Sequence, residues 1–135
     1  MRARLPPPIR GVLETAIYSD DLSLAHAFYG GMLGLQRVLD TPRMLTYTVA
    51  PRQVLLVFKR GATREDSVTP EGVIPGHHSE GPAHFAFAVD DVPKALEIAQ
   101  AHGVRIASPL QQRPDGFKQA YIYDPDDHIV EIVSR

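Results

Sequence analysis

The chemically most informative residues of this chain are an acid and a histidine that begin two similar segments. Glu14 starts Glu-Thr-Ala-Ile-Tyr-Ser-Asp-Asp-Leu, and His84, 70 residues later, starts His-Phe-Ala-Phe-Ala-Val-Asp-Asp-Val. Carboxylates and imidazoles both bind metal ions. The likeness of the two segments indicates an internal duplication, which largely determines an architecture. The pattern therefore predicts a site built between two halves of the chain.

Glu131 is a third residue with unusual surroundings. In the strand predicted over 128–133 it shares a face with Ile129 and Val133, so it is a lone carboxylate among apolar neighbours. Burying such a group is costly unless a cation or hydrogen-bond donors accompany it. Each residue alone has a plainer interpretation: Glu14 as an exposed acid on an edge strand, and His84 as a core histidine bonded to backbone. Their shared placement favours a joint site.

The elements that position these residues follow from local patterns. Residues 12–19 and 84–89 predict strands, and each strand runs into Asp-Asp, which caps a following helix. Because side chains alternate along a strand, Glu14 and His84 share their faces mostly with small residues, while the opposite faces carry larger apolar ones. The larger faces must pack on the helix of their own half, which predicts helices on one side of the sheet and a cavity on the other.

The rest of the chain repeats the same order of elements, so each half is predicted to be β-α-β-β-β. We expect an N-terminal extension, a single domain made of two modules, and a linker or flap without periodicity between them. The boundaries are 1–10 for the extension, 11–135 for the domain, about 12–60 and 83–134 for the modules, and about 61–82 for the linker. The fold class is α+β, a curved, cup-like mixed sheet with helices on the convex side.

Bulk composition excludes several classes of function. The chain has 135 residues, 44% of them hydrophobic, a formal net charge of −2 and no cysteine. This length suits one domain, and a net charge of −2 does not indicate a basic surface that would bind nucleic acid or an anionic membrane. Disulfides and thiolate chemistry are excluded. Without a signal-peptide pattern or a bilayer-length apolar run, a cytoplasmic protein is expected.

Three ordered motifs carry a resemblance to a known family. They are the strand entering Asp-Asp-Leu with Ala-His-Ala-Phe-Tyr and Leu-Gly-Leu after it, His-Phe-Ala-Phe-Ala-Val-Asp-Asp-Val, and Tyr-Asp-Pro-Asp-Asp-His-Ile-Val-Glu-Ile. Over about residues 11–134 the chain resembles the vicinal oxygen chelate superfamily, which includes glyoxalase I, extradiol dioxygenases, and fosfomycin- and bleomycin-resistance proteins.

The resemblance implies metal ligands at the first and closing strands of each half. Carried over residue by residue, it implies three ligands: Glu14, His84 and Glu131. The fourth position falls near Leu55 or Leu56, which cannot bind a metal, and Gln53 is two or three residues out of register. The set differs from a four-ligand glyoxalase I, since the first position is often His and the fourth ligand is missing. By analogy Glu131 is also the candidate catalytic base.

Two carboxylates and one imidazole suit divalent Fe, Mn, Ni, Zn or Co, and the ligand list does not choose among them. Three protein ligands leave positions open for substrate. Tyr47, Tyr121 and Tyr123 lie on predicted strands and are candidates to line the cavity, since tyrosine joins an apolar body to a polar tip. Packing in a core or groove explains them equally well.

The expected function is that of a metal-dependent lyase, isomerase or dioxygenase acting on a small substrate that chelates the metal through adjacent oxygens. The alternative is a metal-free small-molecule binding protein of the bleomycin-resistance kind. Family resemblance further implies a homodimer, with the site either within one chain or shared between two.

Overall fold

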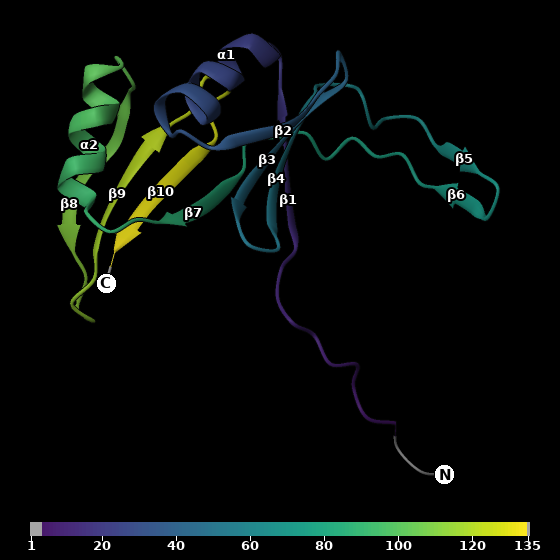
Figure 1. The fold of residues 1–135 in the computed structure, drawn as a ribbon, viewed down its shortest axis with the longest axis horizontal. Coiled ribbons are helices and arrows are strands. Elements are labelled where there is room, and N and C mark those ends of the chain that lie inside the picture. The colour runs from purple at the N-terminus through teal and green to yellow at the C-terminus, as the bar shows by residue number, and fades with distance from the viewer. Residues whose placement is uncertain (1–3, 135) are drawn as a thin grey trace.

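The computed structural model describes residues 4–134, and its main body consists of two βαβββ modules (Figure 1). The first module has the strand order β1-β4-β3-β2 and the second the order β7-β10-β9-β8, with β1–β4 and β7–β10 parallel and the other pairs antiparallel. The predicted α+β class is confirmed, as two four-stranded mixed sheets. The strands are β1 Glu14–Ser19, β2 Gln36–Asp40, β3 Met44–Ala50, β4 Gln53–Lys59, β7 His84–Ala88, β8 Ile106–Gln112, β9 Lys118–Tyr123 and β10 Ile129–Ser134.

Each helix begins where the Asp-Asp pattern predicts. Asp21 accepts backbone N–H bonds at the start of α1 (Leu22–His26), and Asp91 accepts one at the start of α2 (Val92–Ala101). The first helix continues as a π-helical segment, η1 (Ala27–Met32). There a Cβ at Gly30 would lie 2.2 Å from the His26 ring, so a side chain at this position would force that ring to move.

One hydrophobic core joins the two modules. It contains Ile17 and Tyr29 from the first module together with Val130 and Ile132 from the second. The helix-facing sides of both sheets therefore pack into the same interior, as the predicted location of the helices requires. On the opposite sides, Glu14 and His84 and the alanines two residues after each of them are exposed.

A buried polar junction also links the modules, at the turn before β10. The Asp124 carboxylate accepts a hydrogen bond from the Tyr29 hydroxyl at 2.6 Å and others from the backbone of the turn. The fully buried His128 accepts from the Ala83 N–H at 2.8 Å, so its other ring nitrogen donates to the Tyr18 carbonyl at 2.7 Å. Burial, followed by the nearby Asp124 charge, raises the pKa of Tyr29, which keeps this phenol a donor.

The linker contains a hairpin that the sequence pattern did not predict. Strands β5 (Ser67–Thr69) and β6 (Gly72–Ile74) pair antiparallel and project away from the body (Figure 1). The base of the hairpin is held by the buried Glu80, whose carboxylate accepts from Arg64 Nε at 2.7 Å and from the Gly61 N–H. The linker is therefore an ordered hairpin whose base is held in place by hydrogen bonds.

Acid is expected to loosen the linker through Glu80. Burial acts to raise the pKa of this carboxyl, but the hydrogen bonds from Arg64 and Gly61 and the charges of Arg64 and Arg60 outweigh it and hold the pKa below its ordinary value. Because the pKa of Glu80 is lower in the folded chain than its value of about 4.3 in the unfolded chain, the ionised carboxylate stabilises the fold at pH values above about 4.3. This stabilisation is lost as the pH falls through the folded-state pKa. Amide exchange at Gly61 should accelerate, relative to intrinsic exchange, over that acidic window.

In a Glu80→Gln variant, exchange should be fast already at neutral pH and show no acid transition. An equal acid transition in both proteins would contradict the assignment.

The remaining boundaries differ from the predictions mainly in the second module. The strand predicted over 84–89 ends at Ala88, and the strand predicted over 128–133 runs from Ile129 to Ser134. Within the described residues, no helix has the length and apolar character needed to cross a membrane. Residues 1–3 of the predicted N-terminal extension and residue 135 of the predicted domain lie outside the described part of the chain.

Candidate functional site

His84 and Glu131 meet on the exposed side of the second sheet. Pairing of β7 with β10 sets His84 beside Ile129 and Ala86 beside Glu131, so the two side chains share a face one step apart. His84 Nε2 lies 3.6 Å from Glu131 Oε1. The carboxylate is only 9% exposed, while the imidazole is open to solvent. The structure thus brings two of the three predicted ligands together.

The hydrogen bonding of His84 favours a cation between these two groups. Its Nδ1 lies 3.2 Å from the Ile129 carbonyl oxygen, which is only an acceptor, so Nδ1 carries the proton. In the neutral ring Nε2 then presents a lone pair toward the Glu131 carboxylate. Two acceptors facing each other are unfavourable, and either a metal ion or a second proton on His84 relieves this. A ring nitrogen donating to a backbone carbonyl is also the usual arrangement behind a metal-binding histidine.

Glu14 lies on the other sheet and does not join this pair within one chain. Among residues 4–134, no group of three or more His, Asp and Glu side chains is placed to hold a metal ion. The physical reason is the shared core: the helix-facing sides of the two sheets pack together, so the faces that carry Glu14 and His84 are both turned to solvent.

The register of the first sheet identifies the residue equivalent to Glu131. In the second sheet Glu131 lies beside Ala86, two residues after His84; in the first sheet Leu56 lies beside Ala16, two residues after Glu14. The fourth position is therefore Leu56, whose side chain offers no ligand atom. Gln53 is an odd number of residues away and so points to the other side of β4.

The three predicted tyrosines have different surroundings. Tyr121 lies directly opposite Glu131 on β9, and its ring centroid is 5.8 Å from that of His84. Burial, followed by the Glu131 charge and a hydrogen bond to that carboxylate, raises the pKa of the Tyr121 hydroxyl. The hydroxyl therefore remains protonated and can donate to Glu131.

Tyr123 lies opposite Ile129, on the same face of the second sheet as the pair, whereas Tyr47 belongs to the first sheet. Tyr123 packs beneath the guanidinium of Arg105, 4.6 Å from the ring centroid. Tyr47 is fully buried on the helix side of the first sheet, with its hydroxyl 2.8 Å from His26 Nδ1. Burial raises the pKa of Tyr47 to about 12. A substrate contact of Tyr123 stays a prediction, whereas the fully buried side chain of Tyr47 has no surface open to a substrate.

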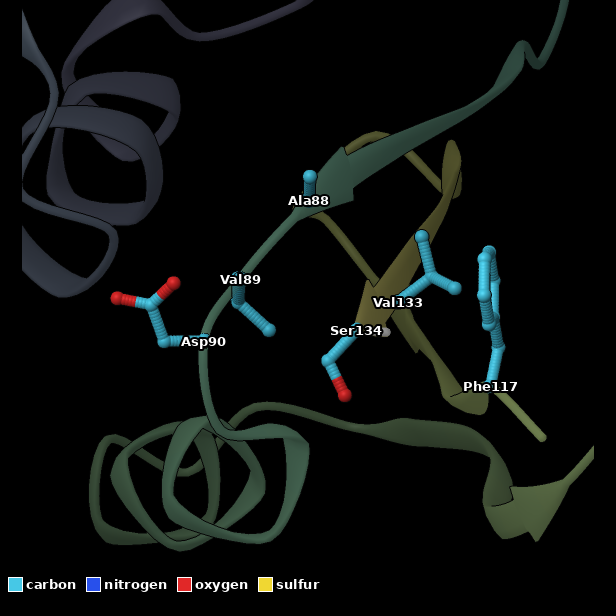
Figure 2. Close-up of a pocket in the computed structure, with 6 residues that line it drawn as sticks. All are labelled: Ala88, Val89, Asp90, Phe117, Val133 and Ser134. Atoms are coloured by element: carbon cyan, nitrogen blue, oxygen red, sulfur yellow. The ribbon is translucent and has the colours of Figure 1, made fainter.

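A cavity of about 350 Å³ opens beyond the pair, at the end of β7 and β10. Two residues beyond the paired Ala86 and Glu131, Ala88 pairs with Val133 on the same strands. Phe117 lies beside Val133 (Figure 2). The small side chains of Ala86 and Ala88 leave the sheet surface open between the pair and this cavity. Val89, Asp90 and Ser134 complete the lining.

Comparison with known proteins establishes the family. Residues 11–132 match the model of the Glyoxalase/Bleomycin resistance protein/Dioxygenase superfamily, and the chain belongs to that superfamily. No curated protein sequence matches the chain.

Solved structures agree with this assignment. A lactoylglutathione lyase from Agrobacterium tumefaciens is 31% identical, with a TM-score of 0.82 over 95% of this chain and 96% of that one. A glyoxalase-related enzyme from Fulvimarina pelagi is 26% identical, with a TM-score of 0.73 over 94% and 89% of the two chains. A glyoxalase/dioxygenase from Nostoc punctiforme, 20% identical with a TM-score of 0.71 over 99% and 97%, shares the fold.

The sequence analysis did not identify two contacts of the pair, and only the second of them has a signal in the sequence. The Ile129 carbonyl that orients His84 belongs to the backbone, and every residue has one. The contact between Tyr121 and Glu131 depends on the register of β9 against β10, which the turn at Asp124 sets. Pairing the last two predicted strands across that turn would have suggested this register.

Proposed function

We propose that this protein is a metal-dependent enzyme of its superfamily, acting on a small substrate with two adjacent oxygens. The observation that carries the proposal is the His84–Glu131 pair, in which Nδ1 faces the Ile129 carbonyl oxygen and Nε2 lies 3.6 Å from a nearly buried carboxylate. A metal ion held between Nε2 and the carboxylate would offset the cost of burying Glu131, and a pure binding protein has no need for such a carboxylate beside a histidine.

We propose further that the complete site forms between two copies of the chain. Glu14 of one copy would supply the third ligand to His84 and Glu131 of the other. Both ligand faces are exposed, and β1 and β7 are edge strands of their sheets with unpaired outer edges. A symmetric dimer would form two such sites from the same surfaces.

These residues suit a transfer of a proton between neighbouring carbons. When bound, a divalent metal supplies Lewis-acid stabilisation of negative charge on the substrate oxygens. Glu131 is the base that takes the proton from one carbon and returns it to the next. The Tyr121 hydroxyl donates to Glu131 and keeps the carboxylate oriented toward the open sheet surface.

The substrate class follows from the most informative relative. The Agrobacterium protein is described as a lactoylglutathione lyase, and a lactoyl thioester carries its carbonyl and hydroxyl oxygens on adjacent carbons. We therefore favour a lyase or isomerase reaction on a 2-hydroxy-acyl or 2-oxoaldehyde adduct. Leu56 in the fourth ligand position distinguishes this site from a four-ligand glyoxalase I.

A mixing experiment tests the metal site and its division between chains together. Glu14→Ala and His84→Ala proteins are each expected to lose tightly bound Ni(II), Zn(II) or Co(II) after dialysis. Unfolding and refolding the two as an equal mixture gives heterodimers that contain one intact site each. Because half the dimers are mixed, roughly one quarter of the wild-type metal content should return. Turnover of methylglyoxal hemithioacetal, catechols and thiol–epoxide pairs is then assayed on the same sample.

The controls separate the possible outcomes. Each variant refolded alone should remain without metal. Metal loss in both variants without recovery on mixing would mean that the site lies within one chain. Wild-type protein that binds none of these ions would reject the enzyme proposal and favour the metal-free binding protein.

A further inference from the structure

The segment before β1 is an extended arm with exposed apolar side chains. Leu5, Ile9 and Val12 are 92%, 79% and 78% exposed, and the arm runs away from the body (Figure 1). Within the described residues, nothing from 4 to 12 hydrogen-bonds to the body of the chain. Three consecutive prolines hold the middle of the arm extended, which lowers the entropy lost when it binds a surface.

The charge of the arm is uniformly positive. Arg4 and Arg10 are its only charged residues between 4 and 13. An apolar, basic strand of this kind fits an apolar groove with an acidic edge.

The cavity at the end of β7 provides such a groove. Ala88, Val89, Val133 and Phe117 give it an apolar lining, and Asp90 stands on the side away from Phe117 with its carboxylate turned outward (Figure 2). Asp90 has no hydrogen-bond or ion-pair partner among the described residues. β7 is also an edge strand, so its outer backbone groups are open to a neighbour.

If the site is shared between two copies as proposed above, residues 4–13 of one copy come close to this cavity of the other. Glu14 approaches His84 of a second copy most directly when the edge strand β1 lies beside the edge strand β7 of that copy, and the proposal takes these two strands as antiparallel. The chain before Glu14 then continues along β7 toward its C-terminal end. At about 3.3 Å per residue, Arg10 lies roughly 13 Å before Glu14, and Ala88 lies roughly 13 Å beyond His84.

We propose that residues 4–13 of one copy dock along β7 of a second copy, with Ile9 in the cavity and Arg10 beside Asp90. This rests on the proposed sharing of the site between two chains. The arm then covers the open end of the sheet surface beyond His84 and Glu131, so each copy supplies a wall of the other copy's site.

A charge exchange tests the contact in the full-length protein. Arg10→Asp and Asp90→Arg should each weaken the dimer about tenfold, measured as the dissociation constant by sedimentation over a concentration series, because the contact occurs twice per dimer. The double variant should return to within about twofold of wild type. Lys59→Asp, an exposed charge reversal at the far end of β4, should leave the constant unchanged. Ile9→Asp should weaken the dimer at least as much as Arg10→Asp.

The outcomes distinguish this inference from the proposed function. A wild-type dimer that binds metal but is unaffected by the Arg10, Asp90 and Ile9 variants would overturn the arm contact and leave the enzyme proposal standing. A dimer that shows the charge exchange but binds no metal would support the arm and reject the enzyme. A wild-type protein that stays monomeric with and without divalent metal would overturn the arm contact.

Discussion

His84→Ala is expected to lower the affinity for divalent metal by roughly 100-fold or more and to remove turnover. Mutation of a residue that only orients a metal ligand typically lowers metal affinity about 10- to 100-fold, and removal of the ligand itself should lower it at least as much. Without the imidazole, Glu131 keeps its contact with Tyr121 but has no nitrogen partner. Titration of the metal-free protein with Co(II), followed by absorbance and calorimetry, measures the change.

The matched control is His78→Ala, which removes an exposed histidine of the linker. Its affinity for Co(II) should equal that of wild type. Because His84 is itself exposed, the urea midpoint of the metal-free His84→Ala protein should stay close to that of wild type, so lost affinity cannot be attributed to unfolding. If a folded His84→Ala protein bound Co(II) with wild-type affinity, His84 would not be a metal ligand and the proposed site would be wrong.

His128→Ala is expected to lower the free energy of unfolding by about 3–5 kcal/mol. The substitution leaves two backbone groups without partners, the part-buried Ala83 N–H and the buried Tyr18 carbonyl oxygen, and each costs about 1–3 kcal/mol. The lost ring also leaves a cavity in a fully buried position, which adds to the cost. Urea denaturation followed by far-UV circular dichroism gives the value.

His102→Ala is the control for this change, because His102 is an exposed residue at the end of α2. It should alter the free energy of unfolding by less than about 1 kcal/mol, as exposed substitutions usually do. Since Tyr18 belongs to the first module and His128 to the second, a loss under 1 kcal/mol for His128→Ala would show that this junction does not hold the modules together.

Much of the fold could be predicted because its signals are local. Asp21 and Asp91 cap their helices through bonds to residues two or three positions away, and the alternation along β1 and β7 follows from strand geometry alone. The hairpin at 67–74 was missed because its strands have three residues each and no alternating apolar pattern long enough to read. The role of His128 has no local signal, since both of its partners are backbone atoms distant in the sequence: the Ala83 N–H, just before β7, and the Tyr18 carbonyl of β1.

By itself, the sequence determined the two βαβββ modules, the face on which each candidate ligand lies, and the absence of a fourth ligand at Leu55 or Leu56. These depend on periodicity and on residue type, which a single chain displays directly. Only the tertiary structure decided that Leu56 is the fourth position, that Tyr47 is buried on the helix side, and that His84 and Glu131 meet without Glu14. The reason is that one core joins the helix-facing sides of both sheets, and that packing turns both ligand faces outward.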